Sequence, residues 1–199
     1  GVAGLAVGFG AQTLVKDFIT GMFILIEDSI HVGDVVRVAG KAGTVEALTV
    51  RTVRMRDLGG VVHTVPFSSV DVIENMTKEY SQAVIDVGVG YRENYDEVVE
   101  VLKAISEDMR ADPDLGPKIL EPMLVLGLNE LADSAVMIRV RIKTEPSQQW
   151  AMRREFNRRV KQRFDELGIE IPYPHRTVYF GEDAQGNAPP LRHRAEPKP

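Results

Sequence analysis

The sequence contains no cysteine, and this absence removes several function classes at once. A disulfide scaffold, a thiolate metal site, a cysteine nucleophile and a CxxC redox motif all need the missing side chain. Its 44% hydrophobic and 27% charged residues are typical of globular chains, which excludes a fully disordered protein and one with many membrane spans. A length of 199 residues predicts one to two folded domains and at most one membrane span.

Histidine is also scarce. The four histidines are His31, His63, His175 and His193. They show neither an HExxH motif nor another paired spacing, so we expect no metal site. Ser68, Ser69 and Asp71 complete the residue types of a triad with His63, but no nucleophile elbow surrounds them, and turn or strand roles fit better. We therefore expect no catalytic residues and no enzyme.

The chain also lacks an excess of basic residues, with 24 basic against 29 acidic residues and a net charge of −5. This balance excludes a surface built wholly for nucleic acid. The charge is unevenly distributed, since residues 78–146 hold 8 basic against 14 acidic residues and residues 147–181 hold 7 against 4. The basic side chains cluster in a predicted helix over 148–167. An RNA-binding helix is one interpretation of this cluster, and a solvated helix face is the other.

Residues 1–30 contain two apolar pieces, 1–15 and 18–26, around the charged pair Lys16-Asp17. Neither piece alone reaches the roughly 20 apolar residues that a membrane span needs, but together they nearly do. Small residues in the first piece have the spacing that lets helix backbones approach closely in lipid. These packing residues are Gly4, Ala6, Gly8 and Ala11.

Leu5 and Phe9 lie four residues apart and therefore share one helix face. Repeated around a symmetry axis, they would form two apolar rings that stop ions by dewetting. The residues alone leave a glycine-rich core helix or an isolated anchor equally open. The second piece is amphipathic, which predicts an interfacial helix after a bend at Gln12-Thr13 that brings Lys16-Asp17 to the membrane surface. Because the chain begins without a Met and with residues typical of the middle of a helix, we expect further sequence upstream of it.

Two further units follow the helix. Residues 31–77 read as a small all-β barrel of Sm-like or SH3-like size, whose five short strands are separated by turn residues. We expect both glycines of Gly59-Gly60 to supply positive φ angles at a tight hairpin turn. Residues 78–181 show the β-α-β-β-α-β order of a ferredoxin-like α+β domain, including a helix over 95–110. Asn94 is expected to cap that helix, Ser147 to cap the helix over 148–167, and Gly168 to end it. Residues 182–199 concentrate Pro, Gly and charge, which predicts a disordered tail.

In this order the pieces resemble the small-conductance mechanosensitive channel (MscS) family from its last membrane helix to the end of its cytoplasmic region. The resemblance covers about residues 1–181 and rests on GLAVGFGAQTLVKDFITGMFIL, on GDVVRVAGKAGTVEALTVRTVRMRDLGGVVHTVPFSSV, on LNEL and on IPYPHRTVYF. The segments GFGAQTLVKDFITG and VPFSSV are most similar to the larger members of the family.

The resemblance implies roles for several positions. It places the pore constriction at Leu5 and Phe9, although the best-known pattern has leucine at both. It places the pore-helix bend at Gln12-Thr13, where the family's glycine is absent, and at Gly21. Pro66-Phe67 stands where the family has a Pro-Asn pair.

The resemblance also implies a homoheptamer in a bacterial or archaeal inner membrane, with the residues after about 30 in the cytoplasm. Its partners would be membrane lipids and the permeating ions and small osmolytes, with no nucleic acid and no cofactor. Such a channel would open under membrane tension during hypoosmotic shock, and a strand at Thr177 to Phe180 would join a small barrel at the base. A membrane-tethered ligand- or RNA-binding domain of Sm/ferredoxin-like type, monomeric or dimeric, is the alternative.

Overall fold

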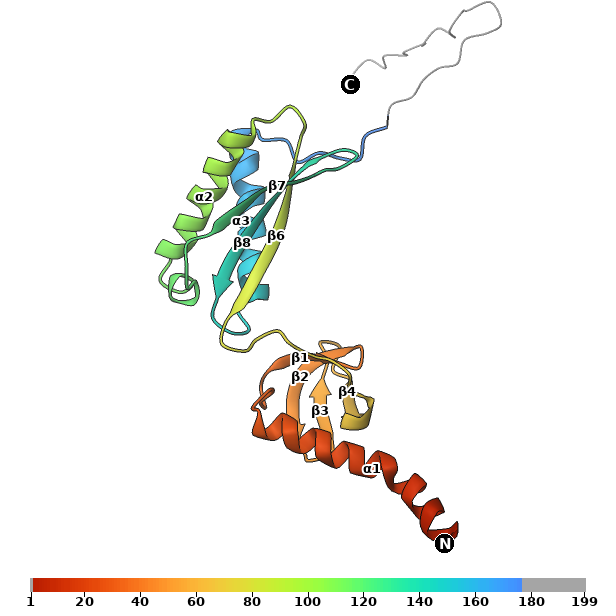
Figure 1. Cartoon of the computed structure of the whole chain (residues 1–199). Helices are drawn as coiled ribbons and strands as arrows, with labels where there is room; N and C mark the ends of the chain where they lie inside the picture. Colours follow the sequence, from red (N-terminus) through yellow and green to blue (C-terminus); the bar gives the residue numbers. More distant parts are fainter. Residues whose placement is uncertain (1, 177–199) are drawn as a thin grey trace, which may run out of the picture.

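The computed structural model describes residues 2–176, with the side chains of Ala3, Leu5, Ala6 and Val7 outside the description. Helix α1 (Val2–Ile26) projects from one end of an elongated molecule, a β-rich unit lies in the middle, and an α/β unit lies at the other end (Figure 1). This order confirms the predicted fold class, a helix followed by an all-β unit and then an α+β unit.

The β-rich unit is one antiparallel sheet with the order β4-β3-β2-β1-β5. Its elements are β1 (Val35–Val38), β2 (Lys41–Leu48), β3 (Thr52–Arg56), β4 (Val62–Pro66), the short 3-10 helix η1 (Phe67–Ser69) and β5 (Ile73–Asn75). Alternation decides which side chains form its core, because successive residues of a strand point to opposite faces. Val53 and Met55 of β3 are buried, whereas Arg54 and Arg56, which alternate with them, are exposed.

The turn between β3 and β4 differs in detail from the predicted one. Only Gly60, with φ 86°, has a positive φ, so the expectation of two such glycines is wrong. Asp57 closes the turn instead, because its carboxylate accepts hydrogen bonds from the Val61 N–H at 2.9 Å and from His63 Nε2 at 3.0 Å. The hydrogen bond from His63, with that from Val61, holds the pKa of the Asp57 carboxyl below its usual range.

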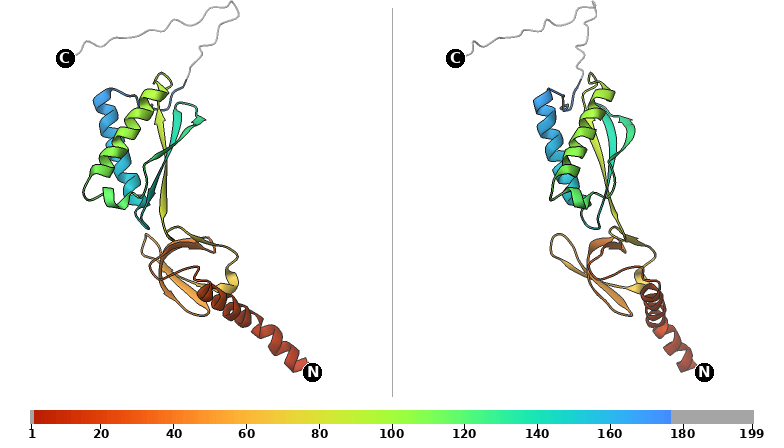
Figure 2. Two further views of the ribbon diagram at one scale, coloured as in Figure 1. Left: turned by 60° about the vertical axis from the view of Figure 1, so that its left-hand side comes forward. Right: turned by 90° about the vertical axis from the view of Figure 1, so that its left-hand side faces the viewer.

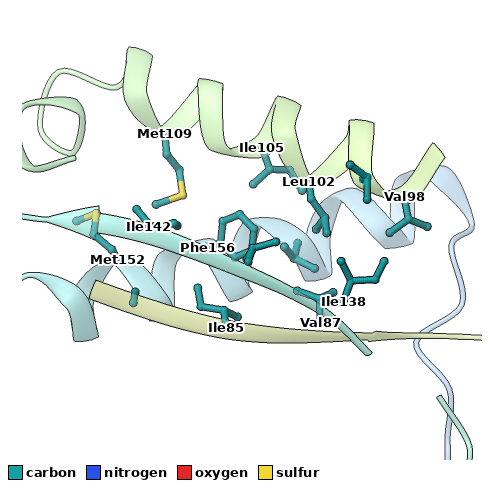
Figure 3. Packing of buried hydrophobic residues seen from close by; sticks show 14 of the residues in the cluster. Ile85, Val87, Val98, Leu102, Ile105, Met109, Ile138, Ile142, Met152 and Phe156 are labelled. Carbon is teal, nitrogen blue, oxygen red and sulfur yellow. The ribbon is translucent and has the colours of Figure 1, made fainter. Parts of the chain in front are cut away.

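The α/β unit packs two helices on one side of a three-stranded antiparallel sheet with the order β6-β8-β7 (Figure 2). Its elements are β6 (Ser81–Val89), α2 (Tyr95–Ala111), the 3-10 turn η2 (Gly116–Lys118), β7 (Leu124–Leu131), β8 (Val136–Thr144) and α3 (Gln149–Leu167). The apolar stripes of both helices meet the inner face of the sheet, and Leu102, Ile138 and Phe156 are fully buried between them (Figure 3).

The helix ends follow local sequence signals only in part. Asn94 caps α2 as predicted, since its side chain accepts a hydrogen bond from the Asp96 N–H. Gly168 ends α3 with φ 72°. The predicted cap at Ser147 is wrong, because Ser147 has φ 66° and donates its N–H to Ser81 Oγ, while Gln148 takes the cap position. The predicted strand at Thr177 to Phe180 and the tail 182–199 lie outside the described residues.

Candidate pore helix and its junction with the β-rich unit

Helix α1 is long and apolar enough to cross a membrane. At 1.5 Å per residue its 25 residues span about 37 Å, more than the roughly 30 Å hydrocarbon core of a bilayer. The segment Gly8–Ile26 meets the criteria of a span, and most of it is exposed in the single chain. Large apolar side chains such as Phe9, Phe18 and Phe23 lie on its surface, which predicts lipid or partner helices around them.

The predicted constriction residues both lie on the N-terminal half of α1. Phe9 is 75% exposed, and the Leu5 side chain is outside the described part. A groove along this half of the helix is lined by Gly4, Gly8, Phe9, Gln12 and Val15. Phe9 therefore borders the groove that the small residues leave open.

Among the described residues, no side chain packs against the glycines of this half. A Cβ placed on Gly4, Gly8 or Gly10 would meet no atom within 4 Å, apart from the helix's own backbone. Ala11 is half-buried, and the Ala6 side chain is not described. Because neighbours within this chain do not require these glycines, packing against other helices stays the prediction for them. The bend at Gln12-Thr13 also stays a prediction, since α1 passes through both residues as continuous helix.

The second half of α1 docks on the β-rich unit through a polar contact. Asp17 is only 2% exposed, and its Oδ1 accepts a hydrogen bond from the Ser68 N–H at 2.6 Å. The neighbouring Lys16 Nζ donates to the Ser68 carbonyl at 2.8 Å. The Arg51 guanidinium lies 3.8 Å from the other carboxylate oxygen of Asp17. A buried carboxylate needs such donors, so this pairing fixes the position of α1 on η1.

One turn further along, the helix backbone at Gly21 approaches the β-rich unit closely. A Cβ at Gly21 would lie 2.0 Å from the Val50 carbonyl oxygen and 2.6 Å from Phe67 Cδ2. Phe67 is fully buried beneath the helix. The resemblance gave Gly21 as a bend point, whereas the structure shows that it lets the helix backbone rest on the Val50 carbonyl and the Phe67 ring. Phe67 of the Pro66-Phe67 pair therefore supplies the phenyl ring against which Gly21 of the helix packs.

Sequence reasoning missed the junction. Asp17 interrupts an apolar run, and the predicted bend would bring its charge to the membrane surface. A carboxylate inside such a run also indicates a buried carboxylate that is paired with a hydrogen-bond donor or a cation. Its partners, Arg51 and Ser68, are remote in sequence, and nothing in the segments that contain them indicates a contact with the helix. The two partners come together only through the fold.

The basic side chains of α3 are mostly paired with acids. Arg158 and Arg159 both bind Glu155, and Arg159 also reaches Asp112 at 2.9 Å. These arginines lower the pKa of Glu155 to about 2. Further along α3, Lys161 pairs with Asp165 and Arg163 with Glu166. These carboxylates would compete with phosphates, which favours a solvated helix face over an RNA-binding one.

Comparison with protein families matches both units behind the helix. Residues 13–78 match the domain described as "Mechanosensitive ion channel, beta-domain". Residues 83–171 match that described as "Mechanosensitive ion channel MscS, C-terminal". The chain belongs to the MscS family of mechanosensitive channels. The first match begins inside α1 and therefore covers the positions of Asp17 and Gly21 as well as the sheet.

Curated relatives carry channel names. The small-conductance mechanosensitive channel of Caldanaerobacter subterraneus is 38% identical over 182 residues, covering 92% of this chain and 64% of the relative. The moderate conductance mechanosensitive channel YbiO of Escherichia coli is 36% identical over 173 residues, covering 86% of this chain and 23% of the relative. The chain thus spans less than two thirds of either relative.

A solved structure shares the fold. The crystal structure of Helicobacter pylori MscS in its closed state has a TM-score of 0.76 and 22% sequence identity, covering 92% of this chain and 72% of that one. At this identity the likeness shows the fold alone. The predicted succession of helix, β-rich unit and α/β unit is therefore an MscS-like architecture.

Proposed function

We propose that this chain is the pore-lining and cytoplasmic part of a mechanosensitive ion channel subunit. The observation that carries the proposal is the joining of an exposed, membrane-length helix to two MscS-family units through a buried polar junction. The channel names of the relatives support the same activity. The full-length protein would open under membrane tension and release ions and small osmolytes during hypoosmotic shock.

The constriction would form where Leu5 and Phe9 of neighbouring copies surround one axis. An apolar ring of this kind stops ions because the confined water leaves it, without fully occluding the pore. Tension favours the state of larger membrane area and so shifts the population toward the open state. The α1 junction would transmit that movement, because Asp17 and Gly21 hold the helix directly on η1.

The assembly we propose is a homoheptamer in the inner membrane of a bacterium or archaeon. Residues after about 30 would lie in the cytoplasm, and further membrane helices would precede α1 in the full-length protein. The exposed glycines of α1 support helix packing between copies. Membrane lipids would cover the apolar residues that the copies leave exposed.

Polar replacement of the constriction tests the proposal. Phe9→Ser and Leu5→Ser in the full-length protein should each hydrate the ring and lower the tension at which the channel opens. Phe23→Ser, on the far half of α1, is the matched control because that side chain is exposed outside the proposed constriction. Single-channel recording in lipid with stepped suction measures the threshold. Unchanged thresholds in both constriction variants would refute the assignment.

A further inference from the structure

Residues 75–81, which join β5 to β6 between the two units (Figure 1), contact the end of α1. Asn75 Nδ2 donates to the Ser29 carbonyl at 3.3 Å, and Lys78 Nζ donates to the Asp28 carbonyl. Both carbonyls lie just beyond the last residue of α1, whose last turn contains no basic side chain. The C-terminal end of a helix carries partial negative charge, which a nearby cation stabilises. Lys78 therefore supplies, from a segment remote in sequence, the cation that this helix end lacks.

The same segment also contacts the start of α3. The Met76 carbonyl accepts hydrogen bonds from Gln149 Nε2 at 3.2 Å and from Ser81 Oγ at 3.0 Å. Gln149 is the first residue of α3 and is buried. Ser81 Oγ in turn accepts a hydrogen bond at 3.3 Å from the N–H of Ser147, which precedes α3. One short stretch of chain thus contacts the membrane-length helix at one point and the α/β unit at another.

These contacts hold the segment in a strained conformation. Glu79 has φ 64°, and the Tyr80 N–H donates to the Lys78 carbonyl at 2.7 Å, which is the pattern of the rare γ-turn with a positive φ. Ser147, which contacts Ser81, has φ 66° as well. A non-glycine residue in this region costs free energy and persists only where its surroundings hold it. Release of either end of the segment would therefore let the same turn relax.

We propose that Lys78 and Gln149 are positioning residues for gating, coupled to each other through residues 75–81. This inference rests on the proposed channel function, since it concerns how a movement of α1 reaches the α/β unit. A displacement of the end of α1 would act on Lys78, pass along the segment to Met76 and reach Gln149. Gln149 Oε1 is buried and has no partner among the described residues. A shifted segment that offers this oxygen an N–H would remove the cost of the unpaired acceptor, which favours a second arrangement of the joint.

Opening tensions of the full-length protein in lipid test the coupling. Lys78→Met removes the charge of an exposed side chain, and Gln149→Leu replaces a buried amide with an apolar group of similar size, so both variants keep the packed cores. Each should shift the tension of half-maximal opening in the same direction. Because either change releases the same turn, the double variant should shift it no further than the larger single change. Lys78→Arg, whose guanidinium can donate to the Asp28 carbonyl, should shift it less than Lys78→Met.

Lys103→Met and Gln162→Leu are the matched controls, because each of these side chains pairs within its own helix, and neither should shift the opening tension. Unchanged tensions in Lys78→Met and Gln149→Leu, or shifts that add in the double variant, would overturn the coupling and leave the channel intact. A purely structural joint would lower the melting temperatures of these variants without moving the opening tension, which overturns the proposal too. An unaltered protein without tension-gated currents would refute the channel itself, and the coupling with it.

Discussion

At the scale of single residues, the contacts of α1 matter most, because one carboxylate and one glycine place a long helix. Asp17 accepts a hydrogen bond from the Ser68 N–H, and Gly21 lacks the side chain that would collide with the Val50 carbonyl. Neither residue is part of the proposed constriction. They are candidates for the coupling between the membrane helix and the cytoplasmic units.

Gly21→Ala should separate α1 from the β-rich unit. The new methyl group would lie 2.0 Å from the Val50 carbonyl oxygen, and backbone cannot yield as a flexible side chain can, so we expect a loss of about 1–3 kcal/mol. Thermal unfolding of the full-length protein in detergent measures it. Gly10→Ala, which meets no atom within 4 Å, should cause no loss from packing within the chain. Equal melting temperatures for both variants would contradict the proposed role of Gly21.

Two buried serines should respond in opposite ways to alanine. Ser106 is 1% exposed, and its hydroxyl has no partner among the described residues. Ser106→Ala should be neutral or stabilise the α/β unit by up to about 1 kcal/mol. Ser81 is 2% exposed, donates to the Met76 carbonyl and accepts from the Ser147 N–H. Ser81→Ala should cost about 1–3 kcal/mol. Chemical denaturation measures both, and a loss for Ser106→Ala as large as that for Ser81→Ala would contradict the assignment.

At the scale of elements, the ion pairs in the middle of α3 join it to the end of α2. Arg159 bridges Glu155 of α3 and Asp112, which follows α2. The pKa of Glu155 falls from 4.5 to about 2 in the folded state. Its stabilisation is therefore complete above about pH 4.5 and lost as the pH falls toward 2.

Glu155→Gln should remove that pH dependence. Because the Glu155 side chain is 23% exposed, we expect a contribution of about 1–2 kcal/mol near neutral pH, less than the full pKa shift implies. Melting temperatures between pH 3 and 7 measure it, and the slope below pH 4.5 should be shallower than in the unaltered protein. Glu107→Gln, whose ion pair with Arg110 is more exposed, is the control. Identical slopes for the unaltered protein and Glu155→Gln would contradict the prediction.

Most elements could be predicted because their signals are local. Alternation in TVRMR and in VMIRVRI, and the apolar stripe of α2, are set by burial of one face. Two local predictions were wrong because another local interaction took their place. Ser147 adopts a positive φ and does not cap α3, and Asp57 forms the turn between β3 and β4 together with Gly60 alone. The junction of α1 could not be predicted, because Asp17, Arg51 and Ser68 are brought together by the sheet. The constriction at Leu5 and Phe9 stays a prediction, since it needs further copies.

At the scale of the whole molecule, the units follow one another in space as they do in the sequence, with α1 running obliquely across the end of the β-rich unit (Figure 1). The membrane-length helix rests on the β-rich unit, and short connections lead from β5 into β6 of the α/β unit. Hydrogen bonds from buried side chains fix the segment between β5 and β6, since the Met76 carbonyl accepts from both Ser81 Oγ and Gln149 Nε2. The chain therefore presents an exposed helix at one end and the α/β unit at the other.

Patch-clamp recording of the full-length protein, reconstituted in lipid while suction is stepped, tests the channel function itself. We expect channel openings whose probability rises steeply with tension. A membrane that stays silent up to rupture, although it holds correctly inserted protein, would refute the channel and favour a membrane-tethered binding domain.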